Sequence, residues 1–553
     1  MQSCESSVSG YCALLSPLFI AYSLKTSFYP RFLSLLFSIL LQLPLAHAHK
    51  EVPAAPVYSA VTLTQGTVRG QVQNGVHCWK GIRYAQPPVG ELRFKAPVAL
   101  PASAGVSDAL GYGGSAMQMP SRFLGDEAVS EDCLFLNIWS PAPDAKKRPV
   151  MVWIHGGGFV VGSGSSALYD GANLAKNGDV VVVTINYRLG VLGFLYFDKN
   201  GQATEGFENN LGISDQMAAL RWVKANIAAF GGDPEQVTIF GESAGGTSVQ
   251  TLLAAPQAKG LFKGAIAESG PAAILWQPDV ACHLTSKFLE LLKVPADSLH
   301  LLKTLPADQL VAAQEELLRY MIDKTTNKVF SPTIDGQVVT NDIFTCLSPR
   351  QSGNVALMIG TNKDESTMFA SRRLRMVPAN AKALKKEFLH LITPEQQQRV
   401  TSAYAAYPRK RGVLDLLTDA VFRMPALRVA DCQSMHAPVY MYRFEWNSFL
   451  LKLSGLRSFH GLEIPFVFGN SEGRNGKLLR LIASKKTIRQ LTGHLQQSWI
   501  NFARYGSPNA PDTQQWKAYT SQERATMIFD RKTRLVLDPD SHIRQAWDGV
   551  YYY

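Results

Sequence analysis

Apolar runs alternate with amphipathic segments along the chain from about Val57 onward. Runs in which consecutive positions are apolar and often β-branched predict buried strands, because a strand covered on both faces has no solvent side. Residues 214–233 instead have apolar positions at helical spacing, which predicts a helix that starts at Ser214 or Asp215 and stops at Gly231-Gly232. This alternation is typical of an α/β sheet. The predicted strands are residues 149–159, 179–188, 236–240, 355–365 and 438–446.

One domain is expected for residues 57–545, because no internal repeat, low-complexity tract or charged linker interrupts the pattern. Two helix-like excursions, residues 281–320 and 379–407, are expected to cap the sheet. Residues 49–56 form a short N-terminal segment in this scheme, and residues 546–553 form a C-terminal tail.

The N-terminus carries a short apolar run, residues 32–45, which follows basic residues and leads to the small residues Ala46 and Ala48. This order of features is typical of an export signal. The run is short for a transmembrane helix and is interrupted by a proline. We therefore expect residues 1–48 to be removed and the protein to be periplasmic or secreted. Membrane contact is expected only through this signal, if it stays uncleaved as an anchor.

The composition is that of a globular protein, with 46% hydrophobic and 18% charged residues. The formal net charge of +11 could indicate a nucleic-acid or anionic partner. Because the basic residues are scattered and no nucleic-acid-binding motif accompanies them, we expect no nucleic-acid partner. The seven cysteines form no CxxC pair or Cys/His cluster, so neither a metal nor a cofactor is expected. Nothing in the sequence sets the oligomeric state.

Residues 241–245 read Gly-Glu-Ser-Ala-Gly, which fits the G-x-S-x-G nucleophile turn. A predicted strand precedes the motif and a helix-like segment follows it, and this is the context that the motif requires. Ser243 is therefore the candidate nucleophile, although the motif alone also fits a tight turn without chemistry. Glu242 raises a separate question, because an unpaired carboxylate beside the nucleophile would be costly if buried.

A second glycine-rich segment, His155-Gly-Gly-Gly-Phe, ends the predicted strand of residues 149–159. A tetrahedral intermediate carries an oxyanion that needs preorganised N–H donors. We assign the amides of Gly157, Gly158 and Ala244 to this oxyanion hole and a structural role to His155. A phosphate loop is not favoured, because no Lys-Ser/Thr pair follows the glycines.

A catalytic serine needs a histidine base and an acid that orients it, in the chain order serine, acid, histidine. Glu365 and His460 meet this order, since each lies in a loop just after a predicted strand. Active sites of open α/β sheets lie at such strand ends.

These segments together resemble the type-B carboxylesterase family, in which bacterial para-nitrobenzyl esterases are closest in character. The resemblance covers about residues 57–545. It implies an α/β-hydrolase fold with a large, mostly parallel sheet, and it implies the same roles for the residues above. The segments that carry it are "GIRYAQPPVGELRF", "SEDCLFLNIWSP", "HGGGF", "NYRLGVLGF", "DQMAALRWVKANIAAFGGDP", "TIFGESAGG", "KDE", "TDAVFRMPALRVA", "HGLEIPFVFG" and "WINFARYGSPN".

The chain departs from the family pattern at several positions. Ser366 stands where the acid loop usually has a glycine. Cys133 occupies the place of one half of a family disulfide, but residues 113–119 hold no partner cysteine, so a bridge to Cys78 remains an alternative. Residues 119–130 hold no tryptophan, which argues against a cholinesterase.

The sequence thus predicts a serine carboxylic-ester hydrolase that acts on a small-molecule ester. A catalytically silent adhesion protein on the same fold is one alternative, and a specialised lipase or carbamate hydrolase is another. Glu242 is expected to point away from Ser243 Oγ, and either to stabilise the imidazolium of His460 or to anchor the turn. Activity is expected to fall below about pH 6.5, where a free histidine protonates. Candidate pocket residues are Tyr112, Phe159, Trp276, Trp446 and Phe449.

Overall fold

A computed structural model describes residues 57–120, 128–198, 204–324, 330–347, 354–370, 376–471, 473–511 and 515–551. The predicted export signal and residues 49–56 lie outside these ranges. Residues 56–553 form one compact unit by their contacts, and this unit is described by itself. No helix of the described residues is both long and apolar enough to cross a membrane.

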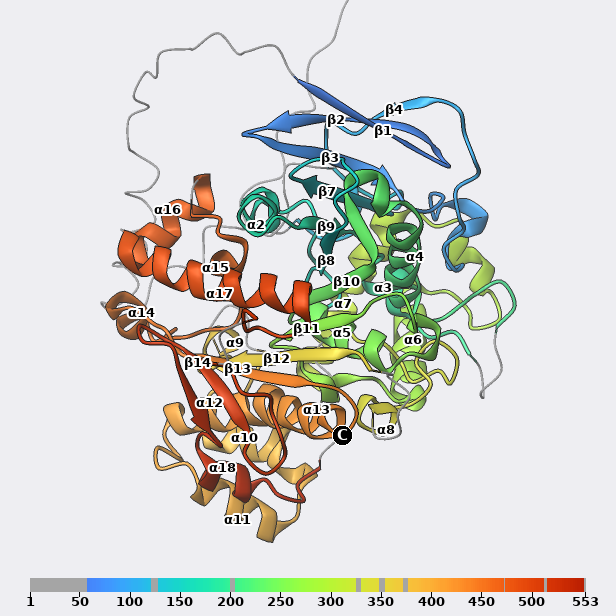
Figure 1. Ribbon diagram of the computed structural model, residues 1–553. Helices are drawn as coiled ribbons and strands as arrows, with labels where there is room; N and C mark the ends of the chain where they lie inside the picture. Colours follow the sequence, from blue (N-terminus) through green and yellow to red (C-terminus); the bar gives the residue numbers. More distant parts are fainter. Residues whose placement is uncertain are drawn as a thin grey trace, which may run out of the picture. The chain divides into compact units, whose positions relative to one another are not determined.

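A large sheet runs through the unit in the order β1-β2-β3-β7-β9-β8-β10-β11-β12-β13-β14-β15, with β4 paired to β2 (Figure 1). The pairs from β9 to β14 along this order are parallel, whereas the pairs from β1 to β9 and the last pair are antiparallel. The large, mostly parallel sheet with flanking helices confirms the predicted α/β fold. Its strands are β1 Tyr58–Leu63, β2 Gly66–Gln73, β3 Val76–Arg83, β4 Val106–Asp108, β7 Phe135–Ser140, β8 Arg148–Ile154, β9 Val181–Ile185, β10 Gly232–Glu242, β11 Gly264–Glu268, β12 Ala356–Asn362, β13 Val439–Phe444, β14 Ala525–Phe529 and β15 Arg534–Leu537.

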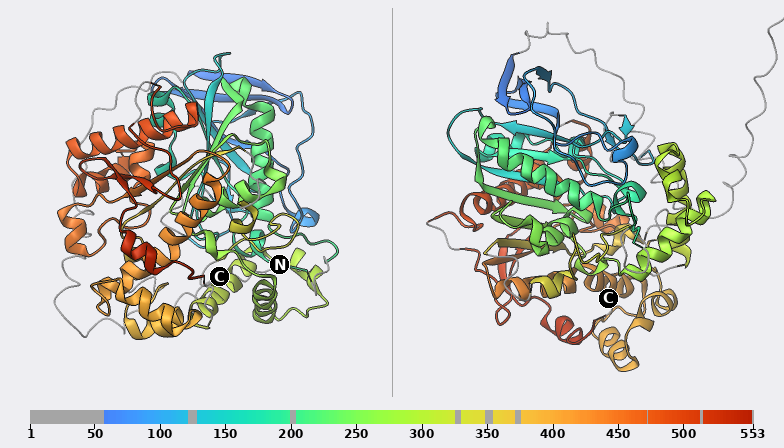
Figure 2. Two further views of the ribbon diagram at one scale, coloured as in Figure 1. Left: turned by 60° about the horizontal axis from the view of Figure 1, so that its bottom comes forward. Right: turned by 90° about the vertical axis from the view of Figure 1, so that its right-hand side faces the viewer.

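Helices cover both faces of this sheet (Figure 2). A separate pair of short strands, β5 Ser115–Ala116 and β6 Val129–Ser130, lies outside it. The helices are α2 Ala172–Gly178, α3 Gly190–Phe194, α4 Leu211–Asn226, α5 Ala244–Ala254, α6 Pro278–Leu292, α7 Ala307–Lys324, α8 Ile343–Leu347, α9 Ser366–Phe369, α10 Ala381–Glu387, α11 Pro394–Ser402, α12 Lys410–Thr418, α13 Met424–Ser434, α14 Phe449–Ser454, α15 Ile464–Phe468, α16 Gly473–Ile482, α17 Lys485–Tyr505 and α18 Ser541–Ala546.

Strand β8 shows why these runs are apolar at every position. Val150 and Val152 belong to the hydrophobic cluster that includes α4, whereas Met151 and Trp153 belong to the cluster that includes α17. Successive side chains of a strand point to opposite faces, so both faces of β8 must be apolar. The sheet is therefore the middle of three layers.

Two predicted boundaries were wrong. Helix α4 begins at Leu211, ahead of the expected start, and Asp215 lies inside it, fully buried. Strand β10 begins at Gly232, which the sequence analysis used as a helix stop. In both cases a tertiary partner overrides the local signal: Asp215 pairs with Arg188, and Gly232 pairs with Arg148 of β8.

The predicted excursions are helical and form part of the packed unit. Residues 281–320 correspond to α6 and most of α7, and residues 379–407 correspond to α10 and α11. The expected C-terminal tail also packs, because Trp547 and Val550 are buried in the cluster that contains Leu384 of α10.

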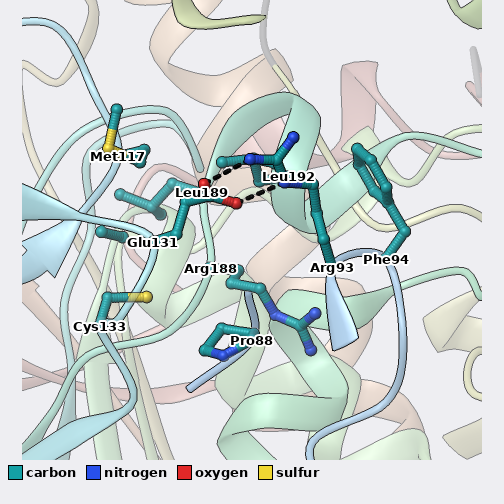
Figure 3. Close-up of a pocket in the computed structure, with 10 residues that line it drawn as sticks. Pro88, Arg93, Phe94, Met117, Glu131, Cys133, Arg188, Leu189 and Leu192 are labelled. Carbon is teal, nitrogen blue, oxygen red and sulfur yellow. Dashed lines mark hydrogen bonds and ion pairs between the residues drawn. The ribbon is translucent and has the colours of Figure 1, made fainter. Parts of the chain in front are cut away.

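Cys78 and Cys133 are both free thiols, so the alternative of a Cys78–Cys133 bridge is wrong. Cys78 and Cys133 belong to hydrophobic clusters on opposite faces of the sheet. Cys133 lines a small cavity of about 10 Å³. Figure 3 shows it together with the ion pair of Arg93 with Glu131, which lines the same cavity. Burial raises the pKa of the Cys78 thiol to about 12, so this group is an inert thiol at neutral pH.

The most deeply buried ion pair joins Arg188, just after β9, to Asp215 of α4. Arg188 Nη2 donates to Asp215 Oδ1 at 2.7 Å, while Nε and the backbone N–H of Arg188 both donate to Oδ2. The two side chains are only 4% and 0% exposed. A buried pair with these hydrogen bonds cannot lose one partner without leaving the other charge uncompensated.

We expect Asp215→Ala to lower the free energy of unfolding by about 3–5 kcal/mol, because it leaves the Arg188 guanidinium unpaired and buried. Urea denaturation followed by circular dichroism measures this loss. Asp108→Ala is the matched control, since it removes the partner of Arg69 in an exposed ion pair and should hardly move the midpoint. Equal effects of the two substitutions would contradict the assigned role of the buried pair.

Candidate active site

Ser243 lies on a sharp turn between β10 and α5, with φ 59° and ψ −122°. An L-residue rarely adopts this region, and the strain of roughly 1–3 kcal/mol is maintained only where the surroundings enforce it. The neighbouring glycines show the enforcement: a Cβ on Gly245 would lie 2.0 Å from the carbonyl oxygen of Ile154, and one on Gly241 would lie 2.6 Å from it. The strand–turn–helix context that the motif requires is therefore present.

The glycine loop after β8 packs directly against this turn. A Cβ on Gly156 would lie 2.5 Å from the carbonyl oxygen of Glu242 and 3.1 Å from Ser243 Cβ. Gly157 and Gly158 have φ values of 110° and 62°. Among the described residues, no backbone or side-chain acceptor receives their N–H groups. The N–H of Ala244 opens α5, where the first amides of a helix have no intrahelical partner.

His155, in contrast, is built into the core. It is fully buried, its ring stacks on Tyr187 with centroids 4.5 Å apart, and its Nδ1 contacts the carbonyl oxygen of Gly156 at 2.8 Å. Burial lowers its pKa to about 4, so it is neutral at physiological pH. These contacts support the structural role expected for it.

Glu365 and His460 meet although 95 residues separate them. His460 Nδ1 and Glu365 Oε2 are 2.6 Å apart, and Glu365 Oε1 accepts the backbone N–H of Asn362 at 2.7 Å. Both side chains are buried. The carboxylate is thus fixed at one oxygen by β12 and presents the other to the imidazole, an arrangement that selects the tautomer with a proton on Nδ1.

Glu242 lies on the other side of the same imidazole. Its Oε1 is 3.1 Å from His460 Nε2, although neither atom makes a hydrogen bond. No hydrogen bond joins Ser243 Oγ to His460 Nε2 in this structure either. Hydrogen bonds between catalytic groups are often long in the absence of substrate, so this geometry does not exclude the pair. His460 is thereby flanked by two carboxylates, Glu365 at Nδ1 and Glu242 at Nε2.

Two further carboxyl groups that the sequence analysis missed lie behind this site. Glu268 ends β11 in direct register with Glu242 on β10, and its Oε1 accepts the indole N–H of Trp499 at 2.8 Å. Glu463 is fully buried three residues after His460, and its Oε2 accepts from the Asn362 amide. Glu268 was detectable, because a glutamate that ends the apolar run "GAIAE" is unusual.

This crowding of buried acids changes their protonation. Burial raises the pKa values of Glu242, Glu268 and Glu463, because the charged form loses its hydration. A neighbouring carboxylate raises the pKa of each of these groups further. Burial alone would lower the pKa of His460, but Glu242 and Glu365 outweigh it and raise this pKa to about 9. Since free histidine titrates near 6.5, the two carboxylates stabilise the imidazolium.

Aromatic residues also contact the imidazole, but they are not those expected from the sequence. The ring centroids of Phe369 and Phe422 lie 4.9 Å and 5.1 Å from the ring centroid of His460. Of the expected pocket residues, Phe159, Trp276 and Trp446 are core residues, and Phe449 is 74% exposed. Tyr112 packs under the Lys80 ammonium at 4.5 Å. Pairing of Phe369 and Phe422 with His460 depends on chain segments far apart in sequence, so no local signal could reveal it.

The described residues contain no group of His, Cys, Asp or Glu side chains arranged to hold a metal ion. The arrangement of a serine on a strained turn, a buried histidine–carboxylate pair and free amides in a glycine loop is that of an α/β-hydrolase with a serine-esterase site.

Comparison with known proteins gives the family. The sequence pattern of the Carboxylesterase family matches residues 58–546, and the chain belongs to this family. It is 39% identical to a para-nitrobenzyl esterase of Bacillus subtilis (strain 168) over 496 residues, which cover 88% of this chain and 98% of the relative. It is 34% identical to a cholinesterase of Mus musculus over 90% of this chain and 86% of the relative.

Solved structures agree with this assignment. A PNB esterase superposes with a TM-score of 0.78 at 38% identity, covering 88% of this chain and 99% of the other. A carboxylesterase of Geobacillus stearothermophilus gives a TM-score of 0.79 at the same identity and coverage. The protein is therefore a carboxylic-ester hydrolase. The expectation that it is not a cholinesterase rests on residues 119–130, of which 121–127 lie outside the described residues, and stays a prediction.

The raised pKa of His460 moves the expected loss of activity to higher pH than the sequence alone indicated. The base form of the histidine exists above its pKa, so kcat/KM of the free enzyme should rise with pH through this value. Glu242→Gln removes one of the two charges that raise the pKa, and the rise should then move to lower pH by about 1–3 units. The measurement is the pH profile of kcat/KM for a soluble ester.

Glu268→Gln is the matched control for this prediction, because it changes the neighbouring carboxyl group on β11, which bonds to Trp499 and forms no ion pair with His460 among the described residues. Its profile should shift much less than that of Glu242→Gln. A profile that stays in place on Glu242→Gln, with unchanged thermal stability, would assign Glu242 to anchoring the turn instead.

Proposed function

We propose that this esterase works through an acyl-enzyme on Ser243, with His460 as general base and Glu365 as the acid that orients it. The observation that carries the proposal is the 2.6 Å contact between His460 Nδ1 and Glu365 Oε2 beside the strained turn that bears Ser243. His460 Nε2 takes the proton of Ser243 Oγ as this oxygen attacks the ester carbonyl. The imidazolium then donates the proton to the leaving alcohol, and water releases the acid in a second, equivalent step.

The oxyanion of each tetrahedral intermediate is proposed to bind the amides of Gly157, Gly158 and Ala244. The free N–H groups of the glycine loop support this role, because hydrogen-bond donors that are already in place can stabilise the negative charge that develops on the ester oxygen. Positive φ values at Gly157 and Gly158 give a reason for glycine there, since other residues rarely adopt them.

Glu242 is proposed as a positioning and electrostatic residue, not as a nucleophile or acid of the reaction. Its contact with His460 Nε2 would stabilise the imidazolium that forms when Ser243 loses its proton. The same carboxylate raises the pKa of His460, so the imidazole is already protonated at neutral pH and cannot accept a proton in that state. Substrate binding that separates Glu242 from Nε2 would lower this pKa when the base is needed.

The protein is further proposed to be exported and to act in the periplasm or outside the cell. Support comes from the order of basic residues, apolar run and Ala46-x-Ala48 at the N-terminus. A catalytically silent adhesion protein on this fold is less well supported, because that class has typically lost the nucleophile whereas Ser243, Glu365 and His460 are all present. A lipase or carbamate hydrolase differs only in substrate, and a panel of esters varied in the acyl and alcohol halves separates these activities.

Ser243→Ala should lower kcat for a para-nitrophenyl ester on the order of 10⁴-fold or more, because it removes the nucleophile and leaves only oxyanion stabilisation and binding. A fluorophosphonate probe should label the wild type and not this variant. Ser248→Ala is a matched control on α5, with a buried hydroxyl that accepts from Gln216 at 3.0 Å. Near wild-type turnover in Ser243→Ala would remove Ser243 from the mechanism.

A further inference from the structure

The short helix α14 carries large apolar side chains that face solvent. Phe449, Leu450 and Leu453 are 74%, 48% and 70% exposed, whereas Leu451 between them is 5% exposed and anchors the helix in the core. Residues 449 and 453, four apart, share one face of a helix, and residue 450 adjoins it. An apolar helix face without a partner is costly in water unless something covers it.

Exposed cations lie on α14 and on the helices that follow it. Helix α14 packs against α16, and α16 packs against α17, so the start of α17 lies close by (Figure 1). Leu481, near the end of α16, is a further exposed apolar side chain, at 48%. The exposed cations are Lys452, Arg457, Lys477, Lys485, Lys486 and Arg489. These six residues with Phe449, Leu450, Leu453 and Leu481 are called the α14 patch.

The charge of the patch is of one sign. Among the described residues from 446 to 511, Glu463 is the only acid, and it is buried beside His460. No ion pair joins any of the six cations to an acid in the described part of the chain. The scattered distribution expected from the sequence therefore does not hold here, because the cations come from three helices that pack in series and from the loop after α14.

A cleft of about 450 Å³ adjoins the patch between the start of α14, the α16–α17 turn and the loop after β14. Lys486 and Arg531 line it, and Asp530 is the one acid in its lining. A cleft with this lining has room and charge for a phosphate headgroup.

The patch is also continuous with the catalytic loops. Thr367 lies two residues after Glu365. Its Oγ1 donates a hydrogen bond at 2.7 Å to the carbonyl oxygen of Leu456, which follows α14. Ser458 and Asp364 exchange backbone and side-chain hydrogen bonds at 3.0 and 3.2 Å. A partner bound to the α14 patch would therefore contact the chain segment that leads into His460.

We propose that the α14 patch binds the surface of an anionic phospholipid membrane, with Phe449, Leu450 and Leu453 inserted among the headgroups and the cations paired to lipid phosphates. Apolar side chains framed by Lys and Arg are the composition of interfacial membrane-binding helices. A nucleic acid would use the cations but leave the apolar side chains in water, and a second copy of this chain would bring like charges together. The inference adds a membrane contact to that expected from the N-terminal signal, and it does not depend on the proposed catalytic roles.

The test measures binding of the full chain to vesicles of phosphatidylcholine with and without 30% phosphatidylglycerol, by sedimentation. Lys452→Gln/Lys485→Gln/Lys486→Gln should weaken binding to the anionic vesicles about tenfold or more, since each cation near an anionic surface contributes to binding. Lys382→Gln/Lys385→Gln/Lys386→Gln on α10 is the matched control and should bind as the wild type does. Raising the salt concentration from 0.1 to 1 M should release the wild type.

A second readout separates the patch from the N-terminal apolar run, which every variant shares. A polarity-sensitive dye on Ser454→Cys, at the end of α14, should shift to the blue with anionic vesicles, whereas the same dye on Gln398→Cys of α11 should not. The unmodified chain, treated with the same dye, gives the background from native cysteines. Phe449→Ser/Leu453→Ser should abolish the shift at Ser454→Cys without lowering the thermal midpoint.

Three results would overturn the proposal: no shift at Ser454→Cys with anionic vesicles, equal binding of the two triple variants, or a concentration-dependent dimer that Phe449→Ser/Leu453→Ser dissociates. Ser243→Ala should bind vesicles as the wild type does. Failure of the membrane proposal therefore remains distinguishable from failure of the proposed catalytic mechanism.

Discussion

The site depends on a close crossing of backbone at the ends of two neighbouring parallel strands, β8 and β10. Gly241, Gly245 and Gly156 leave no room for a Cβ where these strands, the glycine loop and α5 meet. Ser243 is forced into its strained conformation by this crossing and not by its own preference. The same crossing sets the glycine-loop amides beside the serine, so one packing constraint positions both the candidate nucleophile and the candidate oxyanion donors.

Around that crossing the fold concentrates negative charge next to a single histidine. Glu242, Glu268, Glu365 and Glu463 come from four different segments of the chain and are all buried. Such a cluster is tolerable only if some of its members are protonated or paired, which agrees with the upward shift of several pKa values. The imidazole between Glu365 and Glu242 is consequently stabilised in its charged form, with its pKa raised to about 9.

The exposed surface over α14, α16 and α17 carries positive charge, in contrast to the buried acids around His460. Acids gather in the interior behind His460, and cations gather with exposed apolar side chains over α14, α16 and α17. Both arrangements meet in residues 456–460, where the chain passes from the α14 patch into the catalytic loop. If the patch binds a membrane as proposed, the segment that carries His460, the proposed base, would lie close to the lipid surface, where lipophilic esters collect.

The sequence by itself determined the alternation of strands and helices, the strained serine turn, the glycine loop and the chain order of Ser243, Glu365 and His460. These features are local, because periodicity, glycine sterics and short motifs act over a few residues. Only the tertiary structure decided which distant residues meet. Glu268 stands beside Glu242, and the rings of Phe369 and Phe422 contact His460. Cys78 and Cys133 lie on opposite faces of the sheet, and Asp215 belongs to a buried ion pair and does not start a helix. Each of these contacts joins segments far apart in sequence through strand register or helix packing, and no local pattern encodes that register. The charge of the α14 patch is in part local, since its six cations lie between residues 452 and 489, but only helix packing brings them to one side of the protein.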